Sequence, residues 1–289
     1  LVHAQFPAWT HEKSPQSRDH TWRIVWRCGC GHGGGDRGNG PWHRHRRAQL
    51  VYANQGVMTV TTSSAIYTVP PQRAVWMPGE TAHQIDARRS VTMRSLYIKL
   101  SLTEAFSPHP YVLQITPLLR ELIATAFAIG NGYLPDSPQN RIMQVILDQI
   151  AAQPPLELVL PLPSDSRLLR ITRSLMINPA DRRTLDEWAK EVGASKRTLN
   201  RLFSKQTDMS FQKWRQQLRL QHSLELLVAG ESVTRIAGEL GYDNVSAFIA
   251  MFRSCMGTTP RQYLQMSESS VISDKQTLPT PKILFTLPP

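Results

Sequence analysis

The feature that most constrains this chain is a residue pattern that occurs twice in its last third. Ala189 has a counterpart 48 positions later at Ala237, and Phe203 has one 49 positions later at Phe252. The register therefore holds to within one residue across the whole pattern. A repeat of this kind marks one supersecondary unit used twice. Any fold for this chain must contain two similar units.

Each copy has the pattern of a helix, a tight turn and a second helix. In the first copy, apolar residues at i, i+3, i+4 and i+7 predict one buried helix face: Leu185, Trp188, Ala189 and Val192. Gly193 then permits a turn that a side chain would obstruct, and Ser195 can cap the next helix. Gly241 stands 48 positions after Gly193 in the second copy. The sequence therefore predicts two helix-turn-helix units.

The second helix of the first copy has an outward face suited to DNA. Leu199, Leu202 and Phe203 are predicted to point inward, which leaves four polar residues outside: Lys196, Arg197, Asn200 and Arg201. Arginine can pair with a guanine edge and asparagine with an adenine edge. An ordinary solvated helix is the alternative for one copy alone. The second copy in register favours a pair of DNA-binding units.

A long helix is predicted between the two copies. Four large apolar residues recur there at helical spacing: Trp214, Leu218, Leu224 and Leu227. A rigid helix would fix the distance between the two units. Contacts in successive major grooves on one face of DNA require about 34 Å.

Residues 165–265 resemble the two-motif DNA-binding domain of the AraC/XylS family of transcription regulators. Five segments carry the resemblance: Arg197-Thr-Leu-Asn-Arg-Leu-Phe203, Trp214-Arg-x-x-x-Arg-Leu220, Ile236-Ala-x-x-Leu-Gly-Tyr242, Ala247-Phe-Ile-x-x-Phe-Arg253 and Gly257-Thr-Thr-Pro-x-x-Tyr263. The resemblance implies a domain of seven helices that binds promoter DNA.

The resemblance also implies which residues contact bases. In the first unit they match Arg197, Asn200 and Arg201. In the second unit they match a small or apolar set: Val245, Ser246, Ala247 and Ile249. Such side chains can touch thymine methyl groups but offer few hydrogen bonds. We therefore expect the second unit to recognise sequence more weakly.

Charge supports a polyanionic partner. The 289 residues carry a net charge of +11, with a pI near 10.0. The segment from Lys196 to Arg219 holds seven basic residues and one acidic residue. No apolar run approaches the roughly 18 residues that cross a membrane, and no secretion signal pattern opens the sequence. Three cysteines give no disulfide framework. We expect a protein of the bacterial cytoplasm without a membrane partner.

The first 40 residues are predicted to be poorly ordered. They include a glycine-dense stretch with a GxGxxG pattern at Gly29, Gly31 and Gly34. No helical pattern follows it, so a nucleotide-binding loop is not favoured. Cys28, Cys30 and His32 have a spacing that fits no common zinc site. A flexible segment is the favoured interpretation.

Residues 41–153 are predicted to form a small β-domain with two helices. Runs rich in Val, Thr, Tyr and Ile between glycines and prolines predict five strands: Ala48–Ala53, Val57–Thr62, Ala65–Val69, Ala74–Met77 and Thr92–Leu100. Helices are predicted at residues 111–130 and 139–152. Their apolar stripes could pair two subunits into a homodimer, or simply cover the β-domain. A proline-rich linker at 154–164 and a flexible tail at 266–289 complete the domain plan.

Histidines supply a second chemical signal. His43 and His45 lie two positions apart, so on a strand they would point to the same side. Together with Gln49 and the later His83 they resemble the two motifs of cupin barrels, where histidines and a glutamate hold a divalent metal. Gln49 stands where that glutamate would be. Three neutral imidazoles can hold Zn, Fe or Ni.

Three interpretations of these residues stay open. They are a divalent metal site, a metal-free pocket in which His43, His45, Gln49 and His83 bind a small organic effector, or a set of hydrogen-bonded interior histidines. The surrounding segment also resembles the sensor domain of cupin-bearing AraC-type regulators.

The sequence as a whole predicts an α+β protein with an N-terminal cupin-like β-barrel and a C-terminal all-α domain of two helix-turn-helix units. Its predicted function is sequence-specific transcription regulation in response to a small molecule or metal. The predicted partners are double-stranded promoter DNA, RNA polymerase and the effector. The alternative is a metal-dependent cupin enzyme with an accessory DNA-binding domain. Gln49 in place of a carboxylate counts against it, as does the lack of a nucleophile elbow or HExxH pattern.

Overall fold

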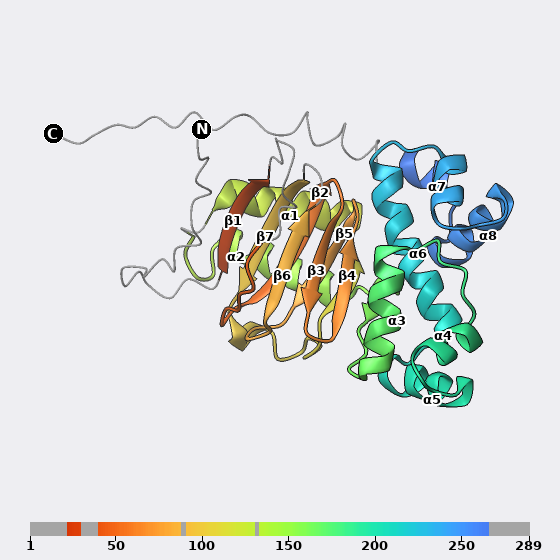
Figure 1. Ribbon diagram of the computed structural model, residues 1–289. Coiled ribbons are helices and arrows are strands. Elements are labelled where there is room, and N and C mark those ends of the chain that lie inside the picture. The colour runs from red at the N-terminus through yellow and green to blue at the C-terminus, as the bar shows by residue number, and fades with distance from the viewer. Residues whose placement is uncertain (1–21, 30–39, 88–90, 131–132, 266–289) are drawn as a thin grey trace, which may run out of the picture.

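The computed structural model describes residues 22–29, 40–87, 91–130 and 133–265. A β-rich domain and a helical domain lie side by side and are joined by one connection (Figure 1). The α+β architecture is therefore as the sequence predicted.

The β-rich domain consists of two antiparallel sheets that pack face to face. The first sheet has the order β1-β7-β2-β5-β8, with β1 Trp22–Gly29, β2 Ala48–Gln55, β5 Arg73–Met77, β7 Val91–Ile98 and β8 Tyr111–Gln114. The second sheet has the order β6-β3-β4-β9, with β3 Met58–Thr62, β4 Ala65–Val69, β6 His83–Ala87 and β9 Val159–Pro161. The apolar interior between the sheets includes Val51, Val60 and Met77, all buried. This is the layout of a flattened barrel.

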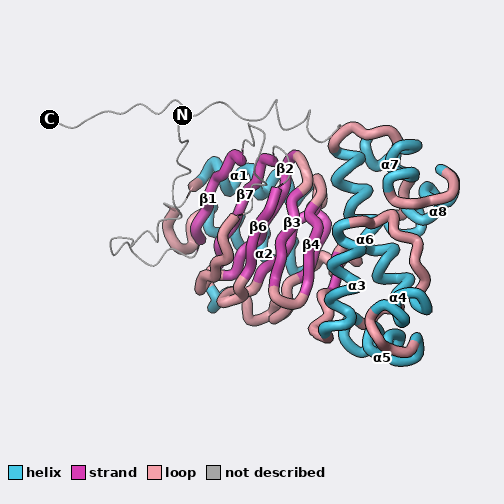
Figure 2. The backbone as a smooth tube through the Cα atoms, in the orientation of Figure 1, coloured by secondary structure: helices cyan, strands magenta, loops and turns pink. Residues whose placement is uncertain are grey.

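Two helices cover the outer face of the first sheet (Figures 1 and 2). Helix α1 (Pro117–Ile129) begins after its cap Thr116, and α2 (Pro138–Ala151) begins after its cap Ser137. Their buried residues form one core with the sheet: Leu119, Ile123, Met143, Ile146 and Ile150 pack with Leu50, Trp76 and Leu96. Most of the predicted apolar stripes thus cover the sheet, while Leu118 on α1 and Val145 on α2 stay exposed.

The helical domain contains the predicted repeat. Its named helices are α3 Ser166–Ile177, α4 Leu185–Glu191, α5 Lys196–Thr207, α6 Phe211–Val228, α7 Val233–Glu239 and α8 Val245–Met256. A further helical stretch starts at Pro260 and reaches residue 265, where the described segment ends. Figure 1 shows α4 and α5 at one end of the domain and α7 and α8 at the other, with α6 running between them. None of the helices in the described segments is long and apolar enough to span a lipid bilayer.

Several strands lie where the sequence analysis placed something else. Residues 22–29 form β1, which pairs along its length with β7, although this region was predicted to be poorly ordered. Residues 111–114 form β8 rather than the start of a helix, because the helix begins only after the cap at Thr116. Strand β6 was not predicted at all. Residues 1–21, 30–39 and 266–289 lie outside the described residues, so the predictions for the glycine-rich stretch and the tail are not tested.

The predicted linker is partly a strand. Its residues Val159–Pro161 form β9, which pairs with β4 at the edge of the second sheet. Leu158 and Leu160 are buried. The connection therefore belongs to the barrel at its C-terminal end and brings the helical domain into direct contact with that sheet.

Candidate functional site

The first helix-turn-helix unit has the local chemistry that its sequence predicted. Thr184 and Glu187 form a capping box at the start of α4. Gly193 adopts a φ of +66°, a left-handed conformation that favours glycine, at the turn. The hydroxyl of Ser195 accepts a hydrogen bond from the amide of Thr198 and so caps α5. These features fix the angle at which α5 leaves the turn.

The core of this unit fixes which face of α5 is free. Leu199, Leu202 and Phe203 are buried against Trp188 and Trp214. The Trp188 side chain is fully buried, and the guanidinium of Arg183 lies 3.5 Å above its ring. The opposite face of α5 carries the four predicted DNA-binding residues, and all four are exposed: Lys196, Arg197, Asn200 and Arg201.

One of these residues already has a partner on α4. The ammonium of Lys196 lies 2.6 Å from a carboxylate oxygen of Asp186, and both side chains are more than half exposed. An exposed pair of this kind contributes about 0–1 kcal/mol. Lys196 can therefore leave Asp186 for a DNA phosphate at little energetic cost.

The second unit has the same backbone plan and a different surface. Ser232 caps α7, and the side chain of Asn244 accepts from the amide of Ala247 to cap α8. Of the predicted contact residues, Ser246 and Ala247 are exposed. Val245 and Ile249 are only half-buried, because they pack on the apolar core. The second recognition face is thus narrower than the sequence analysis predicted.

A shallow groove of about 630 Å³ runs along the outer side of α8. It is lined by Ser246, Ile249, Ala250, Arg253, Ser254 and Thr259. Arg253 is exposed and stands seven positions after Ser246, which places both on one side of the helix. The sequence analysis did not select Ala250 or Arg253. Helical spacing from Ser246 was the signal that could have found them.

The two units are held together by the arginines of α6. The guanidinium of Arg219 donates to the carbonyl of Pro179 at 2.9 Å, and that of Arg215 donates to the carbonyl of Arg183 at 3.1 Å. Both carbonyls belong to the loop between α3 and α4. Gly241 of the second unit packs on the same loop at Ala180. The loop between α3 and α4 therefore contacts both the connecting helix and the second unit, which favours a rigid spacing.

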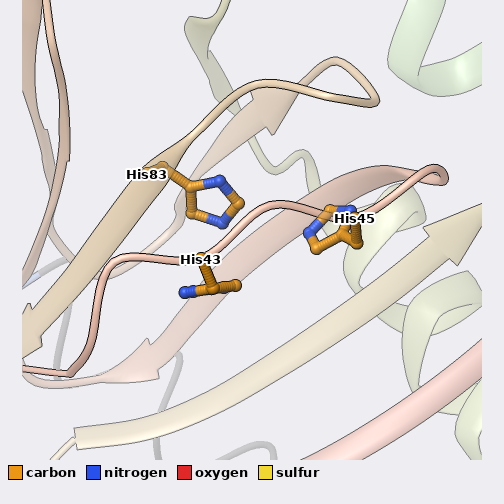
Figure 3. Close-up of side chains that lie close together, drawn as sticks. All are labelled: His43, His45 and His83. Carbon is orange, nitrogen blue, oxygen red and sulfur yellow. The ribbon is translucent and has the colours of Figure 1, made fainter. Parts of the chain in front are cut away.

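The histidine cluster lies at one end of the barrel. His43 and His45 sit in the segment before β2, and His83 begins β6 (Figure 3). The amide of His83 donates to the carbonyl of His43, and the amide of His43 donates back, both at 2.9 Å. One ring nitrogen of each histidine lies within 4.8 Å of the others. The structure thus brings together the three histidines that the sequence analysis selected.

Gln49 lies beside this cluster, fully buried on β2. Its side chain is 3.0 Å from Nε2 of His45, 2.9 Å from the hydroxyl of Ser95 and 3.1 Å from that of Tyr97. Ser95 and Tyr97 on β7 were not selected from the sequence. Their alternation with Gln49 across paired strands was the signal that could have found them.

A glycine lets the histidine segment approach the barrel closely. A side chain at Gly79 would overlap the carbonyl oxygen of Arg46. The amide of Glu80 donates to the carbonyl of His45 at 2.8 Å. The Pro78-Gly79 turn therefore holds the segment between His43 and Arg46 in place.

Burial keeps His83 uncharged at neutral pH. Desolvation lowers its pKa from 6.5 to about 4, against a smaller opposing effect of its hydrogen bond to Thr81. A neutral imidazole retains a nitrogen lone pair, which can accept a hydrogen bond or coordinate a metal.

Comparisons with known proteins agree with both halves of this picture. Residues 30–153 match the family described as AraC-like ligand binding domain, and residues 188–266 match the family described as Helix-turn-helix domain. The chain is 35% identical over 253 residues to the HTH-type transcriptional regulator NimR of Escherichia coli strain K12, covering 88% of this chain and 92% of that protein. The chain belongs to the AraC family of transcriptional regulators.

More distant similarities cover other shares of the chain. The HTH-type transcriptional regulator RipA of Corynebacterium glutamicum is 35% identical over 103 residues, which is 36% of this chain and 31% of that protein. A crystal structure of unsaturated fatty acid-bound ToxT from Vibrio cholerae covers 86% of this chain and 98% of its own, at 12% identity and a TM-score of 0.35. That last similarity is too remote to transfer a ligand.

These matches decide between the two predicted functions. The matched domains and relatives are those of transcriptional regulators with a ligand-binding domain and a DNA-binding domain. The chain is a DNA-binding regulator and not a cupin enzyme.

Proposed function

We propose that this protein recognises its promoter mainly through the first helix-turn-helix unit. Arg197, Asn200 and Arg201 would contact base edges in the major groove, while surrounding lysines and arginines contact phosphates. The observation that carries this proposal is the exposed face of α5, whose cap and core hold these three side chains outward. The exposed small residues Ser246 and Ala247 of α8 would add van der Waals contacts in a neighbouring groove.

Several partners form part of the same proposal. The protein would act in the bacterial cytoplasm on double-stranded promoter DNA and would contact RNA polymerase there. Its β-domain would bind a small-molecule or metal effector. Support comes from the family, whose domain description includes ligand binding, and from the bacterial regulators to which the chain is similar.

The effector signal would reach DNA through α6. The indole nitrogen of Trp214 donates to the carbonyl of Pro161 at 2.7 Å, and the amide of Gln221 donates to the carbonyl of Leu158 at 3.3 Å. Gln217 donates to the carbonyl of Glu157. All three acceptors lie in or beside β9, so a movement of this strand shifts the helix that spaces the two units. An effector drives such a movement only if it binds one arrangement more tightly than the other.

DNA binding to a selected sequence tests the proposal. A pool of random duplexes is enriched on the full-length protein, and the preferred site is then titrated with wild type and with Arg201→Ala. We expect the substitution to cost about 1–3 kcal/mol and to relax preference at one base position. Arg141→Ala serves as the matched control, because Arg141 is an exposed arginine on α2 of the β-domain. Equal weakening on every sequence would make Arg201 a phosphate contact and contradict the assignment.

A homodimer is the finer part of the proposal. Leu118 on α1 is 54% exposed and Val145 on α2 is 41% exposed, both on helices that otherwise cover the first sheet. A second copy of this chain would bury them. Sedimentation of wild type against Leu118→Glu/Val145→Glu tests this. A dimer that becomes a monomer with an unchanged circular dichroism spectrum supports the interface, and a dimer that persists places it elsewhere.

A further inference from the structure

We propose that His43, His45 and His83 bind a divalent transition-metal ion, and that this ion is the effector of the β-domain. The inference rests on the proposed function, because it names the effector class of the sensor. It draws on four observations: the orientation of the three rings, the burial of His83, the place of Gln49 and the position of β6 in its sheet.

Each of the three rings has its Nδ1 beside a backbone carbonyl oxygen. Nδ1 lies 3.0 Å from the carbonyl of Pro41 in His43, 2.6 Å from that of Arg47 in His45 and 2.8 Å from that of Thr81 in His83. A carbonyl oxygen only accepts, so each Nδ1 carries the hydrogen. When such a ring is neutral, its lone pair is at Nε2, where it can bind a metal. Metal-binding histidines characteristically donate their other N–H group in this way, because the bond sets both the tautomer and the ring orientation.

The Nε2 atom of His83 has no hydrogen-bond partner among the described residues, although it is fully buried. A buried polar atom without a partner destabilises the fold, because it loses its hydrogen bonds to water and gains none. Coordination of an ion would remove this cost. The unpartnered nitrogen therefore points to a ligand that completes the site.

The spacing of the rings suits a small ion. One nitrogen from each ring lies within 4.8 Å of the others. Nitrogen ligands about 2.0–2.1 Å from a tetrahedral ion lie about 3.4 Å apart. Small rotations of His43 and His45, which are only half-buried, would close this difference. The ring centroids of His43 and His83 lie 4.3 Å apart, with the two rings tilted by 58° (Figure 3).

The ligand set selects the kind of ion. Three imidazoles suit Zn, Cu, Ni or Fe, whereas Ca and Mg prefer oxygen ligands. No carboxylate joins the cluster among the described residues. A site of three neutral ligands holds its ion less tightly than one with a carboxylate, which suits a sensor that must also release the ion.

Gln49 would couple metal binding to a change in the hydrogen bonds of the barrel. The side-chain oxygen of Gln49 faces Nε2 of His45, and its amide nitrogen donates to the hydroxyls of Ser95 and Tyr97. The 3.0 Å contact between His45 and Gln49 uses the same nitrogen that a metal would take. Metal binding would break this hydrogen bond and free the Gln49 side chain.

The sheet gives the ion a route to the DNA-binding domain. His83 begins β6 at one edge of the sheet β6-β3-β4-β9, and β9 forms the other edge. Helix α6 is bonded to β9 through Trp214 and Gln221. An ion that pulls His83 toward His43 and His45 would therefore displace the sheet that carries α6.

Metal binding to the full-length protein tests the proposal. Chelator-treated protein is titrated with Zn²⁺ by calorimetry and with Co²⁺ by visible absorption. We expect about one ion per chain, lost in His45→Ala and in His83→Ala and retained in His109→Ala, an exposed histidine outside the cluster. Gln49→Glu supplies the missing carboxylate and should tighten binding by about tenfold or more. A folded wild type that binds no ion overturns the proposal.

Two further variants separate the outcomes. The triple variant Cys28→Ser/Cys30→Ser/His32→Ala should still bind the ion. If the triple variant loses the ion while His45→Ala keeps it, the proposed site is wrong. The His45 side chain is only half-buried, so His45→Ala replaces His83→Ala as the test if His83→Ala does not fold by circular dichroism. DNA affinity is then measured with and without Zn²⁺. A change in wild type that is absent in His45→Ala supports the effector role, and no change overturns it. Absence of DNA binding in every state would count against the proposed function instead.

Discussion

The two helix-turn-helix units share a backbone and differ in what they present to solvent. Counted from their N-caps, Ser195 and Asn244, matching positions lie 49 apart. The exposed Arg201 of the first unit thus corresponds to Ala250 of the second, and Asn200 corresponds to the half-buried Ile249. The comparison teaches that duplication of a fold does not duplicate its function. In the proposed function, the first unit supplies most hydrogen bonds to DNA, and the second unit adds contacts that depend on its shape.

The surroundings of the two units differ as well. The first unit has its own core around Trp188 and Trp214, to which the barrel adds only Leu160 and Ile66. The core of the second unit and the barrel interior form one buried cluster, which includes Ile236 of α7 and Val60 of β3. The second unit is therefore the one more firmly attached to the sensor.

Among the variants that test the difference between the two units, Trp188→Ala is expected to change stability the most. Removing a fully buried indole from the separate core of the first unit should cost about 3–5 kcal/mol and unfold that unit first. Its register partner in the second unit is Ile236, also fully buried. Urea unfolding followed by circular dichroism compares Trp188→Ala with Ile236→Ala. A separate early transition is expected only for the tryptophan variant, and a single transition for both would show that the two cores unfold together.

The turn glycines give the next largest contrast. Both have positive φ, +66° at Gly193 and +73° at Gly241. Alanine in this conformation costs about 1–2 kcal/mol. At Gly193 nothing lies within 4 Å of the added carbon, whereas at Gly241 it would lie 2.7 Å from the carbonyl oxygen of Ala180. Gly241→Ala should therefore cost about a further 1–3 kcal/mol.

Thermal unfolding of the two glycine variants measures this difference. Equal losses of stability for Gly193→Ala and Gly241→Ala would mean that the loop at Ala180 moves to make room for the added carbon. The second unit would then not pack tightly against that loop.

A gain of DNA affinity is expected when the second unit is given the missing arginine. Ala250→Arg places a guanidinium on the exposed side of α8 beside Arg253. We expect about 1 kcal/mol tighter binding and a steeper dependence on salt, because one more phosphate is neutralised. Ala128→Arg on α1 is the matched control for added charge. Unchanged affinity would place α8 away from the DNA.

The smallest effect concerns the pair between Lys196 and Asp186. Asp186→Asn should change the free energy of unfolding by less than about 0.5 kcal/mol, because both side chains are exposed. It should also raise DNA affinity slightly, since Lys196 no longer exchanges a carboxylate for a phosphate. Fluorescence anisotropy with labelled DNA measures this. Weaker binding would mean that Asp186 instead orients Lys196 for its contact.

Local patterns predicted most of the helical domain. Its helices begin at Asp, Thr, Ser and Asn caps, the two units turn at glycines, and these signals depend only on neighbours in sequence. The strands were predicted less completely. Strands β6, β8 and β9 are short, and pairing with distant strands, rather than their own sequence, makes them strands.

The same distinction applies to the candidate sites. His43, His45 and His83 were selected from the sequence because two of them lie at strand spacing. Ser95 and Tyr97 were missed, because they reach Gln49 only when β7 pairs with β2.

The sequence by itself determined the two helix-turn-helix units, the outward residues of α5 and the histidines of the barrel, because periodicity and caps act over a few residues. Only the tertiary structure decided that Val245 and Ile249 partly face the core and that β9 docks on α6. It also decided that one nitrogen of each of the three histidines lies within 4.8 Å of the others. These features depend on contacts between segments far apart in the chain, where packing and hydrogen bonding, rather than local propensity, set the free energy.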